Sequence, residues 1–164
     1  MIPLLRTPLG RCRLGVGRVD ITPPPDAYHR SWGAALHDRA EGIHRPLTAT
    51  ALALAPPSGD DMLCALFALD LGWMRAAEME ALLARLREGT GLPPDRLVVT
   101  CSHTHAGANL DPGRAGEPGG EHIAPYLAAL PARLLEAFAA ARDRVAPVDL
   151  TYGRGRCALA LHRD

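Results

Sequence analysis

Apolar residues along this chain gather in short runs separated by turn-forming segments. Residues 14–21 (LGVGRVDI) alternate in the manner of a strand, and the prolines of the following TPPPDAYHRSWG remove ladder donors and exclude a helix. Two further runs of strand length, 47–55 (LTATALALA) and 62–70 (MLCALFALD), are joined by the turn-rich PPSGD. We predict that these two runs form a hairpin of largely buried strands.

The pattern then changes to helical spacing. Four apolar residues recur three and four positions apart: Met79, Leu82, Leu83 and Leu86. This spacing predicts an amphipathic helix from Met74, which should end near Gly89 or Gly91. A second helix is predicted over 124–145, where Pro131 either introduces a kink or marks the true start.

The remaining segments complete the predicted order of elements. RLVVTCSHTH (96–105) is predicted to be a strand, 107–121 is too rich in glycine and proline for regular structure, and 148–164 is predicted to form one or two strands. The order indicates an α/β layered domain with a mixed β-sheet and flanking helices. Because neither a repeat nor a linker divides the sequence, we expect a single domain over 1–164.

Charge and composition narrow the classes of function. The sequence has 18 basic and 18 acidic residues without a basic stripe, so we expect no nucleic-acid partner. It contains no lysine, which excludes Schiff-base chemistry and a phosphate-loop lysine. We find neither a signal peptide nor a run apolar and long enough to span a bilayer, and we expect a cytoplasmic protein with reduced cysteines.

His103 and His105 stand where a predicted strand leaves its apolar run. In an extended strand, side chains two apart point the same way, so both imidazoles would continue the face of Cys101. Two imidazoles aimed together from a strand end suit zinc, which takes neutral nitrogen ligands. The spacing alone leaves two interpretations open: a metal or proton-transfer site, or a polar turn without such a role.

Other polar positions flank this pair. Asp70 ends an apolar strand, where it either caps the following helix region or orients a ligand histidine. HDRAEGIH (37–44) concentrates histidines, acids and an arginine, and is expected to be a loop that is either solvated or part of a polar site. His122 is expected to lie at a helix start.

Two motifs for other chemistries are incomplete. Gly15-Val16-Gly17 begins like a dinucleotide fingerprint, but Asp20 stands at the place of the third glycine and no helix follows. Ser102 precedes a histidine, but on a strand it would point away from both imidazoles, and no serine lies in a Gly-x-Ser-x-Gly elbow. A self-contained serine triad is therefore poorly supported.

The order of several motifs resembles the neutral/alkaline non-lysosomal ceramidase family. GVGRVDITPP, WGAALHDRAEGIHRPLTATALAL, FALDLGWM and GLPPDRLVVTCSHTHAG follow one another, and SHTHAG is similar to that family's Ser-His-Thr-His-Ser-Gly motif. The resemblance implies a zinc-dependent amidohydrolase that cleaves the N-acyl amide bond of ceramide to sphingosine and fatty acid. It implies that His103 is a zinc ligand, that His105 holds the substrate amide or its oxyanion, and that Arg163 lies near the substrate head, although His162 replaces the family's asparagine.

The resemblance also implies that the chain is a part of a larger enzyme. The family's other zinc ligands lie further along a much longer chain, so we expect the N-terminal portion of a catalytic domain, truncated at its C-terminus. We expect this chain alone to be inactive, and to self-associate or pair with a missing C-terminal part. Two alternatives are a zinc-hydrolase scaffold acting on a different amide or ester, and a non-catalytic remnant that binds a partner chain.

Overall fold

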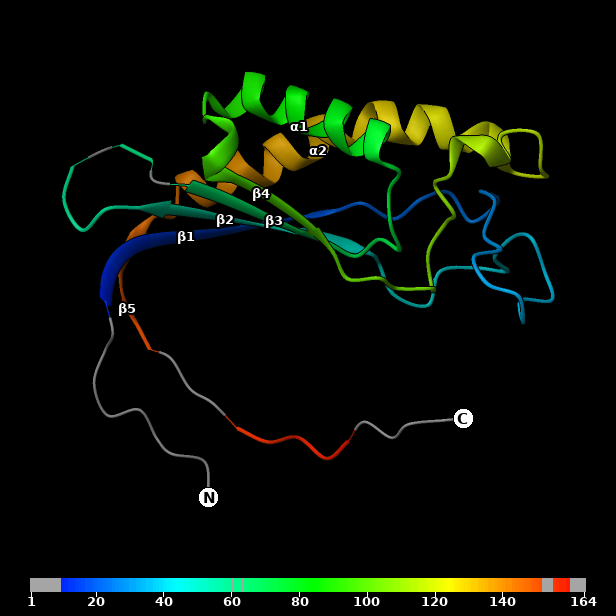
Figure 1. Cartoon of the computed structure of the whole chain (residues 1–164), viewed down its shortest axis with the longest axis horizontal. Coiled ribbons are helices and arrows are strands. Elements are labelled where there is room, and N and C mark those ends of the chain that lie inside the picture. The colour runs from blue at the N-terminus through cyan, green and yellow to red at the C-terminus, as the bar shows by residue number, and fades with distance from the viewer. Residues whose placement is uncertain (1–9, 60, 63, 152–154, 160–164) are drawn as a thin grey trace.

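The computed structural model describes residues 10–59, 61–62, 64–151 and 155–159. Within these residues, five strands form one mixed sheet, and two helices lie together over one of its faces (Figure 1). The strands are β1 (Gly10–Asp20), β2 (Thr48–Ala55), β3 (Cys64–Leu69), β4 (Leu97–Cys101) and β5 (Ala146–Leu150). The helices are α1 (Ala76–Thr90) and α2 (Ile123–Arg142). The predicted α/β layered class is confirmed, with both helices on the same side.

The sheet has the strand order β4-β3-β2-β1-β5. β2 and β3 form the predicted antiparallel hairpin, and β1 pairs antiparallel with both β2 and β5. β3 and β4 run parallel, because α1 carries the chain back between them. These two strands therefore end at the same edge of the sheet, where Leu69 is paired with Cys101.

The packing of α2 on β1 explains the Gly-Val-Gly motif. A Cβ atom at Gly15 would overlap the carbonyl oxygen of Ala141, and one at Gly17 would overlap that of Ala137. The glycines thus let the helix backbone lie directly on the strand, and no nucleotide is needed to account for them. Larger buried side chains complete the core around this contact: Phe67, Leu69, Leu86, Leu134 and Phe138.

Several predicted boundaries agree with the structure, and others are corrected by it. α1 ends at Thr90, and Gly91 caps it with a φ of 70° and an N–H that donates to the carbonyl oxygen of Arg87 at 2.9 Å. The alternative that the second helix starts at Pro131 is wrong, since α2 continues through this residue. Of the predicted C-terminal strands, β5 ends at Leu150 and residues 155–159 have no regular structure.

The sheet face opposite the helices carries an apolar area and, within the described residues, is covered by neither helix (Figure 1). Paired residues of neighbouring strands form two apolar rows on this face. The first row crosses four strands, and the second row lies beside it. The open face comprises Val16, Leu52, Leu66 and Val98 in the first row, with Leu14, Leu54 and Cys64 in the second. Its side chains are half-buried or exposed. Sheets of this composition normally pack on both sides.

The segment Gly120–Arg142, which contains α2, has a length and a mean hydropathy of 1.3 that meet the criteria for a membrane span. The expectation that no run would meet them is therefore wrong. Length and hydropathy do not distinguish a membrane span from a helix that packs on a sheet. In this fold, the stripe Leu130, Leu134, Phe138 and Ala141 is buried within the helix–sheet core.

Candidate functional site

The two histidines lie on a turn at the carboxyl end of β4, here called the histidine turn (residues 102–106). β4 ends at Cys101, and Ser102 donates its backbone N–H to the carbonyl oxygen of Leu69 at 2.9 Å. The next residue, His103, has a φ of 59°, in the left-handed region that non-glycine residues seldom adopt. The prediction that the strand continues to His105 is therefore wrong.

The turn nevertheless brings the two imidazoles together. The ring centroids of His103 and His105 are 5.2 Å apart, with the ring planes at 61°. Both residues are exposed, and the hydroxyl of Thr104 between them accepts the N–H of Ala106 at 3.2 Å. A backbone conformation of this kind costs about 1–3 kcal/mol and is concentrated at functional sites. The turn after β4, rather than the alternation of side chains along a strand, brings the two imidazole rings together.

Trp32 contacts the histidine pair from a distant part of the chain. Its ring centroid lies 6.3 Å from that of His105, and the two planes meet edge-to-face at 74°. The indole is 57% exposed, so burial in the core does not account for its position. The sequence analysis missed this residue, because a tryptophan in a proline- and glycine-containing loop belongs to no periodic pattern.

Asp70 follows β3 at the same edge of the sheet. Its Oδ2 accepts the backbone N–H of Thr48 at 3.0 Å and the hydroxyl of Thr48 at 2.9 Å. Its own N–H donates to the carbonyl oxygen of Thr48 at 2.9 Å. The carboxylate thus joins the end of β3 to the start of β2. α1 begins only at Ala76, and within the described residues no hydrogen bond links Asp70 to the histidine turn.

The segment 37–44 is a loop, as predicted, and it borders a cavity of about 580 Å³. Three histidines contribute to the lining, His29, His37 and His44, and the cavity also touches the end of the histidine turn at Ala106. The rings of His29 and His37 stack with centroids 6.3 Å apart. Burial, and then the neighbouring His37, lower the pKa of His29. The cavity therefore extends from this loop to the end of the histidine turn.

The segment after the histidine turn is held by an ion pair at the start of α1. Arg75 binds the carboxylate of Asp111 through two nitrogens, at 2.6 and 2.8 Å. The hydrogen bonds from Arg75, and then that from the N–H of Gly113, lower the pKa of Asp111 to about 2. This bidentate contact ties the irregular segment to a helix.

The histidine pair alone is an incomplete metal site. Among the described residues, no group of three or more histidine, cysteine or acidic side chains is arranged to hold an ion. Arg163, expected near a substrate, lies outside the described residues. His122 does lie at the start of α2, as predicted, with its Nε2 3.1 Å from a carboxylate oxygen of Asp26.

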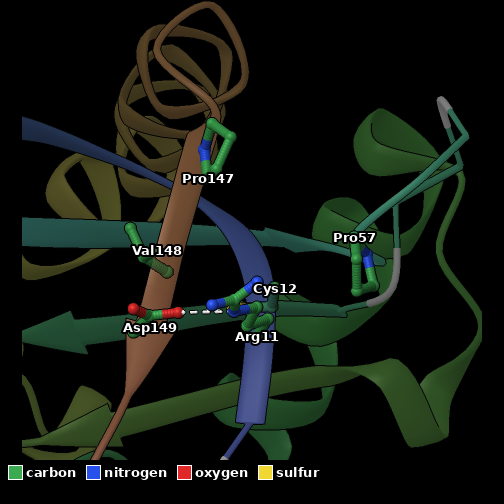
Figure 2. Close-up of a pocket in the computed structure, with 6 residues that line it drawn as sticks. All are labelled: Arg11, Cys12, Pro57, Pro147, Val148 and Asp149. Carbon is green, nitrogen blue, oxygen red and sulfur yellow. Dashed lines mark hydrogen bonds and ion pairs between the residues drawn. The ribbon is translucent and has the colours of Figure 1, made fainter. Parts of the chain in front are cut away.

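A separate hollow of about 400 Å³ lies where β5 crosses the start of β1 (Figure 2). Arg11 and Asp149 form an ion pair of 3.0 Å across it, and both side chains are largely exposed. The loop that carries Trp32 leaves β1 at its other end, after Asp20. This hollow therefore belongs to the strand edge rather than to the histidine site.

Comparison with solved structures identifies ceramidases as structural neighbours. A ceramidase complexed with C2 superposes with a TM-score of 0.63 and 23% identity, over 83% of this chain and 22% of that one. The neutral ceramidase from Pseudomonas aeruginosa gives a TM-score of 0.60 and 22% identity over the same shares. No protein-family model and no curated protein matches the sequence. The chain therefore has the fold of one portion of a ceramidase, spanning about a fifth of those structures.

Proposed function

We propose that this chain is part of a ceramidase-like amide hydrolase and that the histidine turn is its contribution to the catalytic site. The observation that carries the proposal is the pair His103 and His105, 5.2 Å apart, at a strand end in a fold similar to ceramidases. Strand ends and the loops that follow them are where α/β sheets form sites. The strained backbone at His103 supports a functional reason for the pair.

Zinc is the proposed metal. The two imidazoles fit zinc in kind, since it takes neutral nitrogen ligands, but a catalytic zinc normally has three protein ligands. We propose that His103 is one of them, that Asp70 supports it indirectly, and that the others come from a further part of a ceramidase-like protein. Zinc, when bound, supplies a water of lowered pKa at neutral pH. His105 would donate a hydrogen bond to the oxygen of the substrate amide as charge develops on it.

The open face is the proposed surface for that further part. Its first apolar row crosses four strands, and about four-fifths of the ceramidase neighbour lies outside the portion that superposes. We propose that a second polypeptide layer with an apolar face covers these rows. In its absence, two copies of the chain would cover each other, because exposed apolar patches drive association.

The cavity of about 580 Å³ bears on a second candidate substrate class. Most residues of its lining are apolar, among them Ile43 and Leu47, but His37, Glu41 and His44 also line it. A different amide or ester that carries both apolar and polar groups would fit this mixed lining and is the second candidate. Hydrolysis of N-acyl sphingosines, compared with that of short polar amides, separates these candidates.

The test joins this chain to the remaining portion of the Pseudomonas aeruginosa neutral ceramidase. The joined protein should hydrolyse an amide and bind zinc. His103→Ala should lose both zinc and activity, whereas His105→Ala should keep its zinc and lose about 100- to 1000-fold in turnover. A His103→Ala protein that retains stoichiometric zinc would show that His103 is not a ligand. His122→Ala is the matched control, because this histidine pairs with Asp26 outside the turn.

A further inference from the structure

Asn109 is a buried polar residue four positions after His105. It is 9% exposed and is the one polar or charged residue in the buried core of the described part of the chain. Its Nδ2 donates to the carbonyl oxygen of Arg30 at 2.9 Å, and its Oδ1 accepts the N–H of Asp111 at 3.1 Å. Its backbone N–H donates to the carbonyl oxygen of Tyr28 at 2.9 Å. The amide is therefore bonded on both sides in one orientation.

These bonds join two segments that are far apart in the sequence. Arg30 lies two residues before Trp32, and Asn109 lies four residues after His105, so the amide bond joins the two segments that carry these rings. The indole is 57% exposed and cannot be held there by burial alone. A buried polar group left without its partner costs about 1–3 kcal/mol, so breaking the side-chain hydrogen bonds of Asn109 is unfavourable.

We propose that Asn109 is a positioning residue, whose bond to the Arg30 carbonyl holds the indole of Trp32 against His105. The indole then limits the directions in which the His105 imidazole can turn, and so fixes it relative to His103. What this orientation does for catalysis rests on the function proposed above. The orientation itself can be measured without any activity.

Two substitutions separate the effect of the side-chain bond to Arg30 from that of the other hydrogen bonds of Asn109. Asn109→Asp keeps the shape and the oxygen that accepts from Asp111, but replaces the donor to Arg30 by a second oxygen. Asn109→Ala removes both side-chain bonds, and both variants keep the backbone bond to Tyr28. Thr90→Val is the matched control, because Thr90 donates to the carbonyl oxygen of Leu86 at 2.7 Å, at the end of α1 opposite Arg75.

The measurement is the fluorescence of Trp32 in the 164-residue chain, with Trp73→Phe removing the other of the two tryptophans. The emission of an indole depends on the groups that contact it, so His105→Asn should change the emission of Trp32 at a fixed pH. This difference in emission reports the contact between the two rings. In chains that carry Asn109→Asp or Asn109→Ala, the same His105→Asn replacement should change the emission much less, whereas in a chain with Thr90→Val the change should be kept. A full His105-dependent change in emission in Asn109→Asp would overturn the proposal.

A second measurement holds even if both variants fail to fold. In the unsubstituted chain, nuclear Overhauser contacts should connect the Trp32 and His105 rings, and the side-chain amide protons of Asn109 should exchange slowly. Absence of the ring contacts, or fast exchange of that amide, would refute the positioning role. If the His105-dependent change in emission is lost in Asn109→Asp while turnover of the joined enzyme is unchanged, the positioning role stands and the catalytic role proposed for His105 is wrong.

Discussion

Replacing the two outer valines of the open face should weaken association of the chain. Val16→Thr and Val98→Thr keep branched side chains suited to strands, but make the ends of the first row polar. The two valines are 44% and 46% exposed, so nearly half of each side chain remains to be buried by a covering layer. Burying a whole valine contributes about 1.5 kcal/mol, which gives about 0.7 kcal/mol for each and about 1.4 kcal/mol for both.

The size of the effect distinguishes the two kinds of covering layer. A symmetric pair of chains buries both faces, so the double variant should lose about 3 kcal/mol, or about 100-fold in the dissociation constant. Pairing with a different polypeptide buries one face and should lose about tenfold. Sedimentation over a range of concentrations measures the first, and titration of the remaining ceramidase portion measures the second.

A matched substitution away from the sheet completes this test. Leu36 is 92% exposed in the loop after β1, so Leu36→Thr removes apolar surface without touching the open face. It should leave association unchanged. A monomer at all concentrations, or a double variant that associates as tightly as the unsubstituted chain, would refute the assignment of the open face as the contact.

Three further outcomes are expected. The 164-residue chain alone, supplied with zinc, should have negligible amidase activity, which an assay with N-acyl sphingosines checks. Gly17→Ala should lower the free energy of unfolding by about 1–3 kcal/mol, because the added Cβ would overlap a carbonyl oxygen of α2. The added Cβ of Gly116→Ala would contact nothing, so this control should leave the free energy of unfolding almost unchanged, and thermal unfolding compares the two variants. The pKa of Asp111 is lowered from its ordinary value of 3.8 to about 2, so the ionised carboxylate stabilises the folded chain above pH 3.8, and this stability is lost as the pH falls toward about 2. Because Arg75→Gln removes the main cause of the lowered pKa, it should reduce the loss of stability between about pH 5 and about pH 2.

The arrangement of elements could be predicted because it follows from local periodicity. In β2, the buried positions Ala49, Ala51 and Ala53 alternate with half-buried ones, which is the pattern of a strand with two different faces. The spacing of Leu82 and Leu86 likewise marks the buried side of α1. Such patterns depend on residues close in sequence, and the mixed sheet follows from their order.

The geometry of the candidate site could not be predicted in the same way. The left-handed backbone at His103 ends β4 early, although neither asparagine nor glycine signals such a conformation there. The contact of Trp32 with His105 and the bond of Asn109 to Arg30 join residues more than seventy positions apart. Only the folded arrangement of the loops specifies these contacts, since no local pattern encodes them.

Two independent features point to the same kind of partner. The histidine turn contributes one proposed ligand, His103, where a catalytic zinc normally takes three protein ligands, which is an argument from chemistry. The open face leaves apolar rows uncovered, which is an argument from packing. One polypeptide layer would answer both if it packed on the open face and extended past the edge where β3 and β4 end. Its metal-binding residues should therefore lie beyond that edge, close to Asp70 and His103, and mutations there should remove zinc without weakening the contact between the layers.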